Sequence, residues 1–330
     1  MKEKQMTKNQ SGSAERRIPS ALNLMIALFA YTFSLFCLAG ASGRGLYYES
    51  PIFTFLFAAG FSLSGNTIYS LLHESVHRIF SRNLWVNNAF GILSAAFFPT
   101  GFTFHKISHL GHHRRNRTDL ELFDYYTDPK DRFLKSYQLY SLLTGFYWLS
   151  IPVGCILYLF MGPLFRSQLF LDKAVKPMGL KPMADAIIES KKKFLAAEIL
   201  FTIFFQVGIF YLFNLSIEGV FACYAAFALL WSSLQYTDHA WSVRDVKNGA
   251  WNLKVNPVMR YIFLNYHFHL AHHQHPGISW INLPQYADPG ETRPSHLGIY
   301  LSLWKGPRFT EEAPPADLDK KTLEELERQL

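Results

Sequence analysis

Thirteen histidines occur in this chain of 330 residues, and eight of them fall into three short motifs. The first motif has two histidines four residues apart, and the other two each have three histidines at positions i, i+3 and i+4. The motifs are His73/His77, His109/His112/His113 and His269/His272/His273. On a helix these offsets place the imidazoles on one face, a turn apart. Histidine is the commonest side-chain ligand for transition metals, so the spacing predicts metal binding.

A ninth histidine, His239, follows an apolar run that ends near Leu234, and Gln235 lies one helical turn before it. Nine imidazoles exceed the coordination sphere of one ion and suit two ions with four or five nitrogens each. The predicted metal ligands are His73, His77, His109, His112, His113, His239, His269, His272 and His273. Imidazole suits zinc, copper, iron and nickel, so these residues alone leave the metal open.

Other polar residues near the motifs are candidates for contacts with the ligands or with a metal-bound water. This set is Gln235, Asn265, Asp238 and His105. His105 lies four residues before His109, where an interfacial ring is the simpler interpretation. Acidic side chains close to the motifs are expected to fix the tautomers of the ligand rings. They are Glu74, Asp119, Glu121, Asp124 and Asp238.

The composition is typical of a membrane protein. Charged residues make up only 17% of the chain, against the quarter usual in soluble domains, while 49% is hydrophobic and 16% aromatic. The net charge of +7 comes from basic residues in the linkers between apolar runs, which is a topology signal and does not indicate nucleic-acid binding. The three cysteines lie inside apolar runs without a CxxC pair, which argues against a thiolate site or a disulfide framework.

Four apolar runs are long enough to span a bilayer as helices. They are Ala21–Ala41, Pro51–Leu72, Phe194–Phe213 and Ile217–Leu234. We expect Leu84–Phe104 to be interfacial or partly buried, and Tyr140–Phe165 to form a re-entrant hairpin broken at Pro152, Gly154 and Pro163. The predicted architecture is therefore all-α, with four spans, a re-entrant hairpin and a cytoplasmic cap that carries a two-metal site. A polar segment (1–19) would precede the membrane domain (20–310), and a tail with a short amphipathic helix near Thr322 (311–330) would follow it.

Charge predicts the orientation of these spans. The N-terminus and the segments 78–135 and 166–193 are rich in Lys and Arg, and positive loops stay in the cytoplasm. The Asn214–Ser216 turn has no basic residue and is expected outside. Four spans then leave both termini and all three motifs on the cytoplasmic side, whereas five would place the third motif opposite the first two.

The chain resembles the integral-membrane fatty acid desaturase and hydroxylase family, whose motifs HxxxH, HxxHH and HxxHH occur here in order. The third motif continues through Gly277-Ile-Ser-Trp-Ile-Asn-Leu-Pro284, as in the bacterial and plant members, and the resemblance spans Leu71 to Pro284. It implies a non-haem di-iron centre, bound by the nine histidines, that uses O2 to oxidise an unactivated C–H bond of a lipid acyl chain. Fatty acid desaturation is the leading expectation, and a lipid or carotenoid hydroxylase or ketolase is the alternative. Where the acyl-CoA desaturases have an asparagine, this chain has Gln235.

The sequence has no separate cytochrome b5 module and no four-cysteine iron–sulfur motif, so electrons are expected from an external ferredoxin or cytochrome b5 type donor. A membrane protein that binds or transports metal is the alternative from another functional class. Transporters place polar ligands near the bilayer midplane and often contain internal repeats. Here the motifs flank the apolar runs and no repeat is visible, which favours the oxidase.

Overall fold

The computed structural model describes residues 18–43 and 50–315, and these are mostly helical. The elements run in the order α2 (Ser20–Ala41), α3 (Pro51–Val76), α4 (Leu84–Phe97), α5 (Phe102–Arg115), β1 (Tyr125–Tyr126), η1 (Pro129–Asp131), α6 (Arg132–Leu143), α7 (Phe146–Phe160), α8 (Gly162–Phe165), α9 (Gln168–Phe170), η2 (Leu171–Val175), α10 (Lys181–Glu189), α11 (Lys192–Leu212), α12 (Ile217–Gln235), α13 (Pro257–Ile262), α14 (His269–Gln274), η3 (Leu283–Gln285), α15 (His296–Leu303) and β2 (Arg308–Phe309). Most of the predicted N-terminal segment, and the tail helix expected near Thr322, lie outside the described residues.

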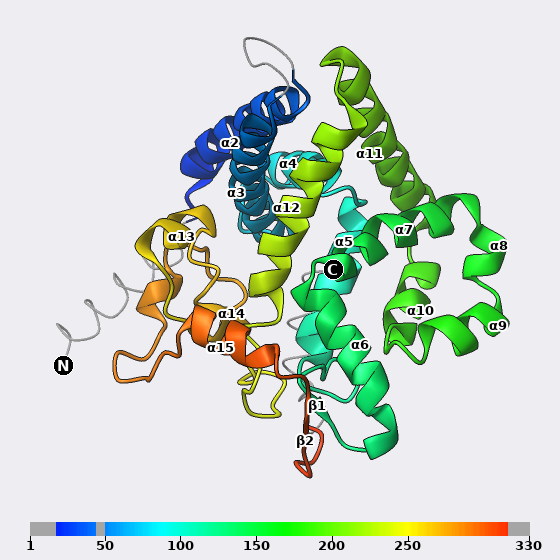
Figure 1. Cartoon of the computed structure of the whole chain (residues 1–330), viewed down its shortest axis with the longest axis vertical. Helices are drawn as coiled ribbons and strands as arrows, with labels where there is room; N and C mark the ends of the chain where they lie inside the picture. The colour runs from blue at the N-terminus through cyan, green and yellow to red at the C-terminus, as the bar shows by residue number, and fades with distance from the viewer. Residues whose placement is uncertain (1–17, 44–49, 316–330) are drawn as a thin grey trace, which may run out of the picture.

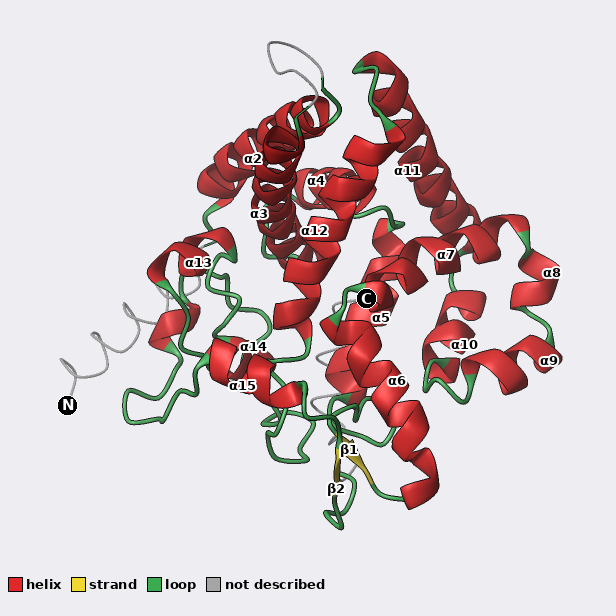
Figure 2. Cartoon of the chain, viewed as in Figure 1, coloured by secondary structure: helices red, strands yellow, loops and turns green. Residues whose placement is uncertain are grey.

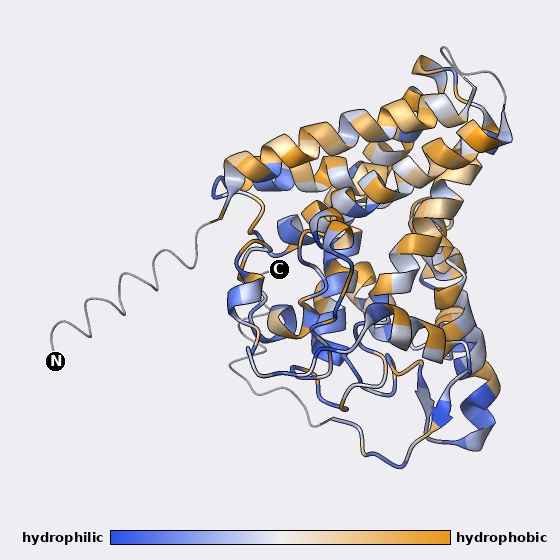
Figure 3. Cartoon of the chain, turned by 60° about the vertical axis from the view of Figure 1, so that its left-hand side comes forward, coloured by the Kyte–Doolittle hydropathy of each residue, from blue (hydrophilic) through white to orange (hydrophobic). Residues whose placement is uncertain are grey.

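The four predicted spans correspond to α2, α3, α11 and α12, which are long and apolar enough to cross a membrane. They gather at one end of the molecule, and the more hydrophilic segments form a cap at the other end (Figures 1, 2 and 3). This arrangement agrees with the predicted all-α membrane architecture.

Small residues let α2, α3 and α12 pack closely. The hydroxyls of Ser34 on α2 and Ser64 on α3 lie 2.7 Å apart, and Ser62 of α3 donates a hydrogen bond to the carbonyl of Ala226 on α12 at 2.8 Å. Small side chains of this kind bring helix backbones close together where apolar surroundings provide little hydrophobic driving force. These contacts fix the position of α3, whose C-terminal end carries the first histidine motif.

The predicted interfacial segment Leu84–Phe104 forms two helices rather than one. Asn83 caps α4 by accepting hydrogen bonds from the amides of Trp85 and Val86, and the chain turns at Pro99 before α5 begins. Helix α4 packs against α3 and α11, so it is partly buried as expected. The turn aims α5 away from the spans and into the cap (Figure 1).

A bent pair of helices lies where the broken hairpin was expected; its main bend is not at Pro152 or Gly154, and a second break, between α7 and α8, lies next to Pro163. Helices α6 and α7 meet at 93° around Gly145, whereas Pro152 lies inside α7 without ending it. Gly145 has φ +82°, and a Cβ there would approach the backbone of Ala228 on α12 to 3.0 Å. A side chain at this position would meet both the α12 backbone and an unfavourable φ, which explains a glycine at the bend.

A buried ion pair ties the cap together. The guanidinium of Arg117 is fully buried and donates a hydrogen bond to the Asp124 carboxylate at 2.7 Å. The hydroxyl of Tyr236, which follows α12, bonds the same carboxylate at 2.5 Å. The segment after α5 is thereby fixed against the end of α12, which brings the second histidine motif and His239 to the same place.

Candidate metal centre

Three helices present the histidine motifs at the boundary between the spans and the cap. Helix α3 carries His73 in its last turn and is followed at once by His77 at the C-cap position, and α5 carries the second motif in its last two turns. The short helix α14 begins at His269 and carries the whole third motif. His239 lies in the turn that follows α12, and its backbone amide donates a hydrogen bond to the carbonyl of Tyr236 at 3.1 Å. The three motifs thus lie together, as the four-span topology predicts.

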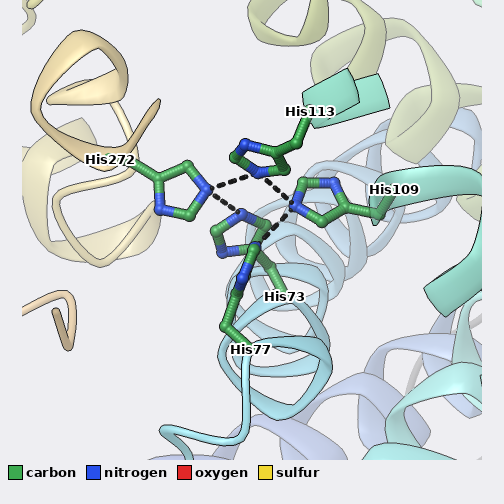
Figure 4. Close-up of side chains that lie close together, drawn as sticks. All are labelled: His73, His77, His109, His113 and His272. Carbon is green, nitrogen blue, oxygen red and sulfur yellow. Dashed lines mark hydrogen bonds between the residues drawn. The ribbon is translucent and has the colours of Figure 1, made fainter. Parts of the chain in front are cut away.

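Five of these histidines form a first group, which contains His73, His77, His109, His113 and His272. Their rings come from α3, α5 and α14 and point toward one centre (Figure 4). The Nε2 atoms of His73 and His272 lie 3.0 Å apart, and those of His77 and His109 lie 2.8 Å apart. His113 Nε2 lies 3.1 Å from His109 and 3.0 Å from His272. All five residues are buried.

The other four histidines form a second group, which contains His112, His239, His269 and His273. His239 Nε2 lies 3.1 Å from His112 Nε2 and 3.0 Å from His269 Nε2. His273 Nε2 lies 3.2 Å from His269 Nε2. All nine predicted histidines therefore fall into two adjacent groups, with five imidazoles in one and four in the other.

The tautomers of the second group fit a cation between the rings. His239 Nδ1 lies 2.9 Å from the carbonyl oxygen of Gly249, which can only accept, so the ring proton is on Nδ1. His112 Nδ1 likewise lies 2.6 Å from the Glu121 carboxylate. In neutral rings the two Nε2 atoms then face each other with lone pairs and no proton between them. The two lone pairs would repel each other, and a metal ion between them removes this repulsion because each lone pair can coordinate it.

The spacing in both groups also suits coordination. Two nitrogens about 2.1 Å from one ion lie about 3.0 Å apart at right angles and about 3.4 Å apart at tetrahedral angles. The Nε2 contacts of 2.8–3.2 Å match the edges of such a shell. In the first group, His113 Nε2 meets two other Nε2 atoms, and one proton cannot serve both contacts. Transition metals that favour imidazole are the chemical fit to this donor set.

Burial keeps the imidazoles in the form that binds metal. Burial, with neighbouring histidines adding to it, lowers the pKa of His109, His113 and His272 well below 6.5. The same causes lower the pKa of His269 and His273. These rings are therefore neutral at physiological pH and offer lone pairs without first releasing a proton.

Asp238 is buried directly behind the second group. One carboxylate oxygen lies 3.4 Å from His269 Nδ1, and neither oxygen has a hydrogen-bond partner within residues 18–43 and 50–315. Burial raises the pKa of this carboxyl well above its usual 3.8. Positive charge nearby favours the ionised form of such a group, and a metal in the second group would supply that charge.

The remaining candidates from the sequence lie around the groups in different ways. Gln235 accepts a hydrogen bond from the Tyr69 hydroxyl at 3.1 Å. His105 stacks near His109, outside both groups, and burial lowers its pKa to about 3. The Asn265 side chain accepts a hydrogen bond from Arg260 and donates one to the carbonyl of Trp280, and neither partner is a ligand ring.

Of the acidic residues considered, Glu121 and Asp238 lie beside ligand rings. Glu74 instead accepts from the amide of Trp280, which ties α3 to the segment after the third motif. Asp119 pairs with Arg244, and Asp124 pairs with Arg117. These three carboxylates hold together the segments that carry the motifs.

A cavity of about 360 Å³ opens onto the histidines. His109 of the first group and His112, His239 and His269 of the second group form part of its wall. The rest of the wall is mainly apolar and comes from α5, α7, α12 and the segment 165–184, including Phe104, Ile151, Leu157, Phe170 and Trp231. A long apolar molecule in this cavity would lie against both histidine groups.

The cavity wall also includes two tyrosines that were not predicted as site residues. Tyr69 and Tyr266 are buried with their rings 6.1 Å apart, and Tyr266 packs against His73 and His269. Tyr69 precedes His73 by four residues and Tyr266 precedes His269 by three. Within α3 the offset from Tyr69 to His73 is the same-face spacing that identified the histidines, whereas Tyr266 lies in the turn before α14, where helical spacing gives no signal.

Comparison with known families decides the relationship. The family model described as fatty acid desaturase matches residues 48–302, which covers all three motifs and His239. The chain belongs to the fatty acid desaturase family. No individual curated protein matches the sequence at a significant level. Family membership, the membrane helices and the histidine groups make this chain a membrane oxidoreductase that acts on lipid.

Proposed function

We propose that the two histidine groups hold a non-haem di-iron centre, and that the chain uses O2 to desaturate a fatty acyl chain. Membership of the fatty acid desaturase family supports the reaction class, and the two all-imidazole groups support a pair of ions. The bound iron pair would supply the redox chemistry that activates O2. The nine histidines are the proposed ligands, with Gln235, Asp238, Asn265 and His105 as neighbours that tune the site.

The observation that carries this proposal is the shared cavity. Histidines from both groups form one part of its wall, and apolar side chains form most of the remainder. Phe104, Leu157 and Phe170 exclude water and give an acyl chain a continuous apolar surface. Tyr69, Tyr266 and Gln235 provide hydroxyl and amide groups where the cavity meets the histidines.

The proposed reaction balances with an external reductant. Desaturation breaks one C–H bond on each of two neighbouring carbons and forms a carbon–carbon double bond. O2 becomes two waters by taking two electrons and two protons from the substrate, two electrons from a donor protein and two protons from solvent. We propose a donor of the ferredoxin or cytochrome b5 type.

The membrane orientation is part of the same proposal. We place both termini and the cap in the cytoplasm and the Asn214–Ser216 turn outside, because the basic linkers favour that arrangement. Residues 20–310 would then form one membrane domain, with residues 1–19 and 311–330 as cytoplasmic segments. Cysteine-accessibility labelling that places residues 109 and 269 on opposite sides would contradict this orientation.

The decisive experiment combines metal and product analysis of purified protein. We expect about two irons per chain, as the two histidine groups require, and a product that has lost two hydrogens. Active protein with one zinc and no iron would contradict the proposed centre. A product that gains one oxygen atom would identify a hydroxylase on the same scaffold and contradict desaturation.

A metal transporter is disfavoured by the surroundings of the histidines. Although polar residues such as Asn116, Glu121 and Gln235 also line the cavity that reaches the histidines, most of its exposed surface is apolar. A hydrated ion finds few oxygen ligands along such a wall, whereas an acyl chain is stabilised by it. The cavity thus favours the oxidase.

A further inference from the structure

Helix α7 separates the cavity at the histidines from the outside of the molecule. One set of its residues, at spacings of three and four, forms an exposed apolar stripe: Phe146, Leu149, Val153, Ile156 and Phe160. A second set lines the cavity: Tyr147, Ser150, Ile151, Val153, Gly154 and Leu157. Because an α-helix repeats every 3.6 residues, these sets occupy neighbouring faces of one helix. The cavity wall at α7 is therefore only one helix thick.

The exposed stripe of α7 suits lipid better than water. Together, α6 and α7 are long and apolar enough to form a broken span or a re-entrant loop. Helix α7 also packs against α11 and α12, which are two of the four spans. A contiguous exposed apolar face marks contact with a membrane or another protein, and beside spanning helices the bilayer is the occupant that is already present.

Four residues of the cavity wall are also exposed at the surface of the protein. They are Ser150 and Val153 on α7, Ala174 on η2, and Leu120 in the segment after α5. A residue that is both exposed and part of the lining lies where the cavity meets the surroundings. The cavity is therefore bordered at the surface by the lipid-facing side of α7 and by η2.

The charges beside this border suit the polar part of a lipid. Lys173 and Lys176 lie on either side of Ala174 in the sequence, and both are exposed, as is Asp172. Two lysines and one aspartate leave a net positive charge, which attracts phosphate at a membrane surface. The η2 side of the border is thus basic and the α7 side is apolar, like the headgroup and acyl layers of a bilayer.

We propose that the border between α7 and η2 is a lateral portal, through which the acyl chain of a bilayer phospholipid enters the cavity without leaving the membrane. This inference rests on the proposed lipid oxidase function and names its substrate class as a lipid of the bilayer rather than a water-soluble acyl thioester. An acyl chain that moves sideways past Val153 keeps its apolar surface away from water, so its transfer avoids the cost of hydrating that surface.

Photolabelling tests the portal without relying on turnover. A phospholipid with a diazirine on its acyl chain is incorporated into nanodiscs that contain the full-length protein, and mass spectrometry locates the adducts after illumination. We expect adducts on cavity residues such as Ile151 and Phe104 as well as on the exposed stripe. Labelling of the stripe alone would overturn the portal, and this result does not depend on the folding of any variant.

Val153→Trp and Ile156→Trp form a matched pair. Both residues are 49% exposed on the same stripe, but only Val153 lines the cavity. Val153→Trp should lower cavity labelling, and kcat/KM for the phospholipid, by about tenfold or more, because added bulk in a fitted apolar space disfavours its occupant. Ile156→Trp should remain close to the unaltered protein. Equal effects of the two substitutions, in proteins with the same metal content, would contradict the portal.

The source of the acyl chain is tested by how it is supplied. Iron-loaded protein receives the same fatty acid either in a nanodisc phospholipid or as its coenzyme A thioester in water. We expect the phospholipid to be oxidised faster, and equal or faster oxidation of the thioester would overturn the substrate class. Cavity labelling with no oxidation of either compound would refute the oxidase function but support the portal, whereas oxidation without cavity labelling would do the reverse.

Discussion

Two of the four ligand rings in the second group are oriented by a hydrogen-bond acceptor at Nδ1. The Gly249 carbonyl holds His239 through Nδ1, and the Glu121 carboxylate holds His112 in the same way. These contacts leave Nε2 as the coordinating atom in both rings. Partners of this kind usually matter for metal affinity almost as much as the ligands themselves.

His239→Ala should lower iron content and abolish turnover, because it leaves the second group with three of its four imidazoles. Metal analysis of purified protein, together with lipid product analysis, measures both effects. His275→Ala is the matched control, since His275 is exposed and lies outside both groups. Full iron and substantial turnover in His239→Ala would refute its role as a ligand.

Glu121→Ala should weaken metal binding by about 10- to 100-fold without removing a ligand, because the His112 ring loses the partner that fixes its tautomer. Competition with a chelator measures this affinity. Glu189→Ala, at the exposed end of α10, should bind metal normally. Unchanged affinity in Glu121→Ala would show that this carboxylate does not orient His112 for metal binding.

At the scale of elements, α5 is the critical helix because it contributes ligands to both groups. Its N-terminus lies next to α11, where the Glu198 carboxylate accepts hydrogen bonds from the amide of Thr103 at 2.6 Å and from its hydroxyl at 2.9 Å. Gly101, the residue at the N-cap position, has no side chain for this purpose. A membrane-spanning helix therefore caps the helix that carries the second motif.

Glu198→Ala should destabilise the protein by about 1 kcal/mol, the usual cost of losing a helix cap, and should also reduce metal retention. Thr103→Val, which removes only the hydroxyl contact, should have a smaller effect. Thermal unfolding and metal content after gel filtration report the two consequences. Equal stability of Glu198→Ala and the exposed control Glu218→Ala would exclude the capping role.

The elements that could be predicted from the sequence are those that depend on residues close together in the chain. The four spans and the three motifs follow from hydrophobic length and from helical spacing, and the structure places them as expected. The bend at Gly145 was not among the expected breaks at Pro152, Gly154 and Pro163, because the contact that requires it is with Ala228, far away in the chain. The partners of Asn265 depend on the turn after α13 and on the position of Trp280, which spacing along the chain does not encode.

At the scale of the whole molecule, the histidine groups join parts of the chain that have little else in common. The first group alone connects α3, α5 and α14, which begin near residues 51, 102 and 269. Beside it, Trp280 donates hydrogen bonds to Glu74 on α3 and, through its indole, to Asn23 on α2 at 2.9 Å. Metal at this position would act as a cross-link between the spans and the cap.

Removal of metal should therefore lower the thermal unfolding temperature of the intact protein, because an ion that binds only the folded state stabilises it. A chelated sample and the same sample after iron is restored provide the comparison, measured by unfolding in detergent or nanodiscs. His239→Ala should show a smaller difference between the two conditions. An unchanged unfolding temperature would mean that the cap is held by the protein's own contacts alone.

The order of the ligands along the chain also determines when each metal ligand becomes available during synthesis. Four ligands of the first group precede residue 114, whereas three of the four in the second group follow residue 238. A ribosome adding about 5–20 residues per second needs roughly 10–30 s to cover the roughly 160 residues between the second and third motifs. During that interval the early histidines are already outside the ribosome while their last partner has not been made. The first group can therefore begin to acquire an ion early, whereas most of the second group exists only once His269 and His273 have been made.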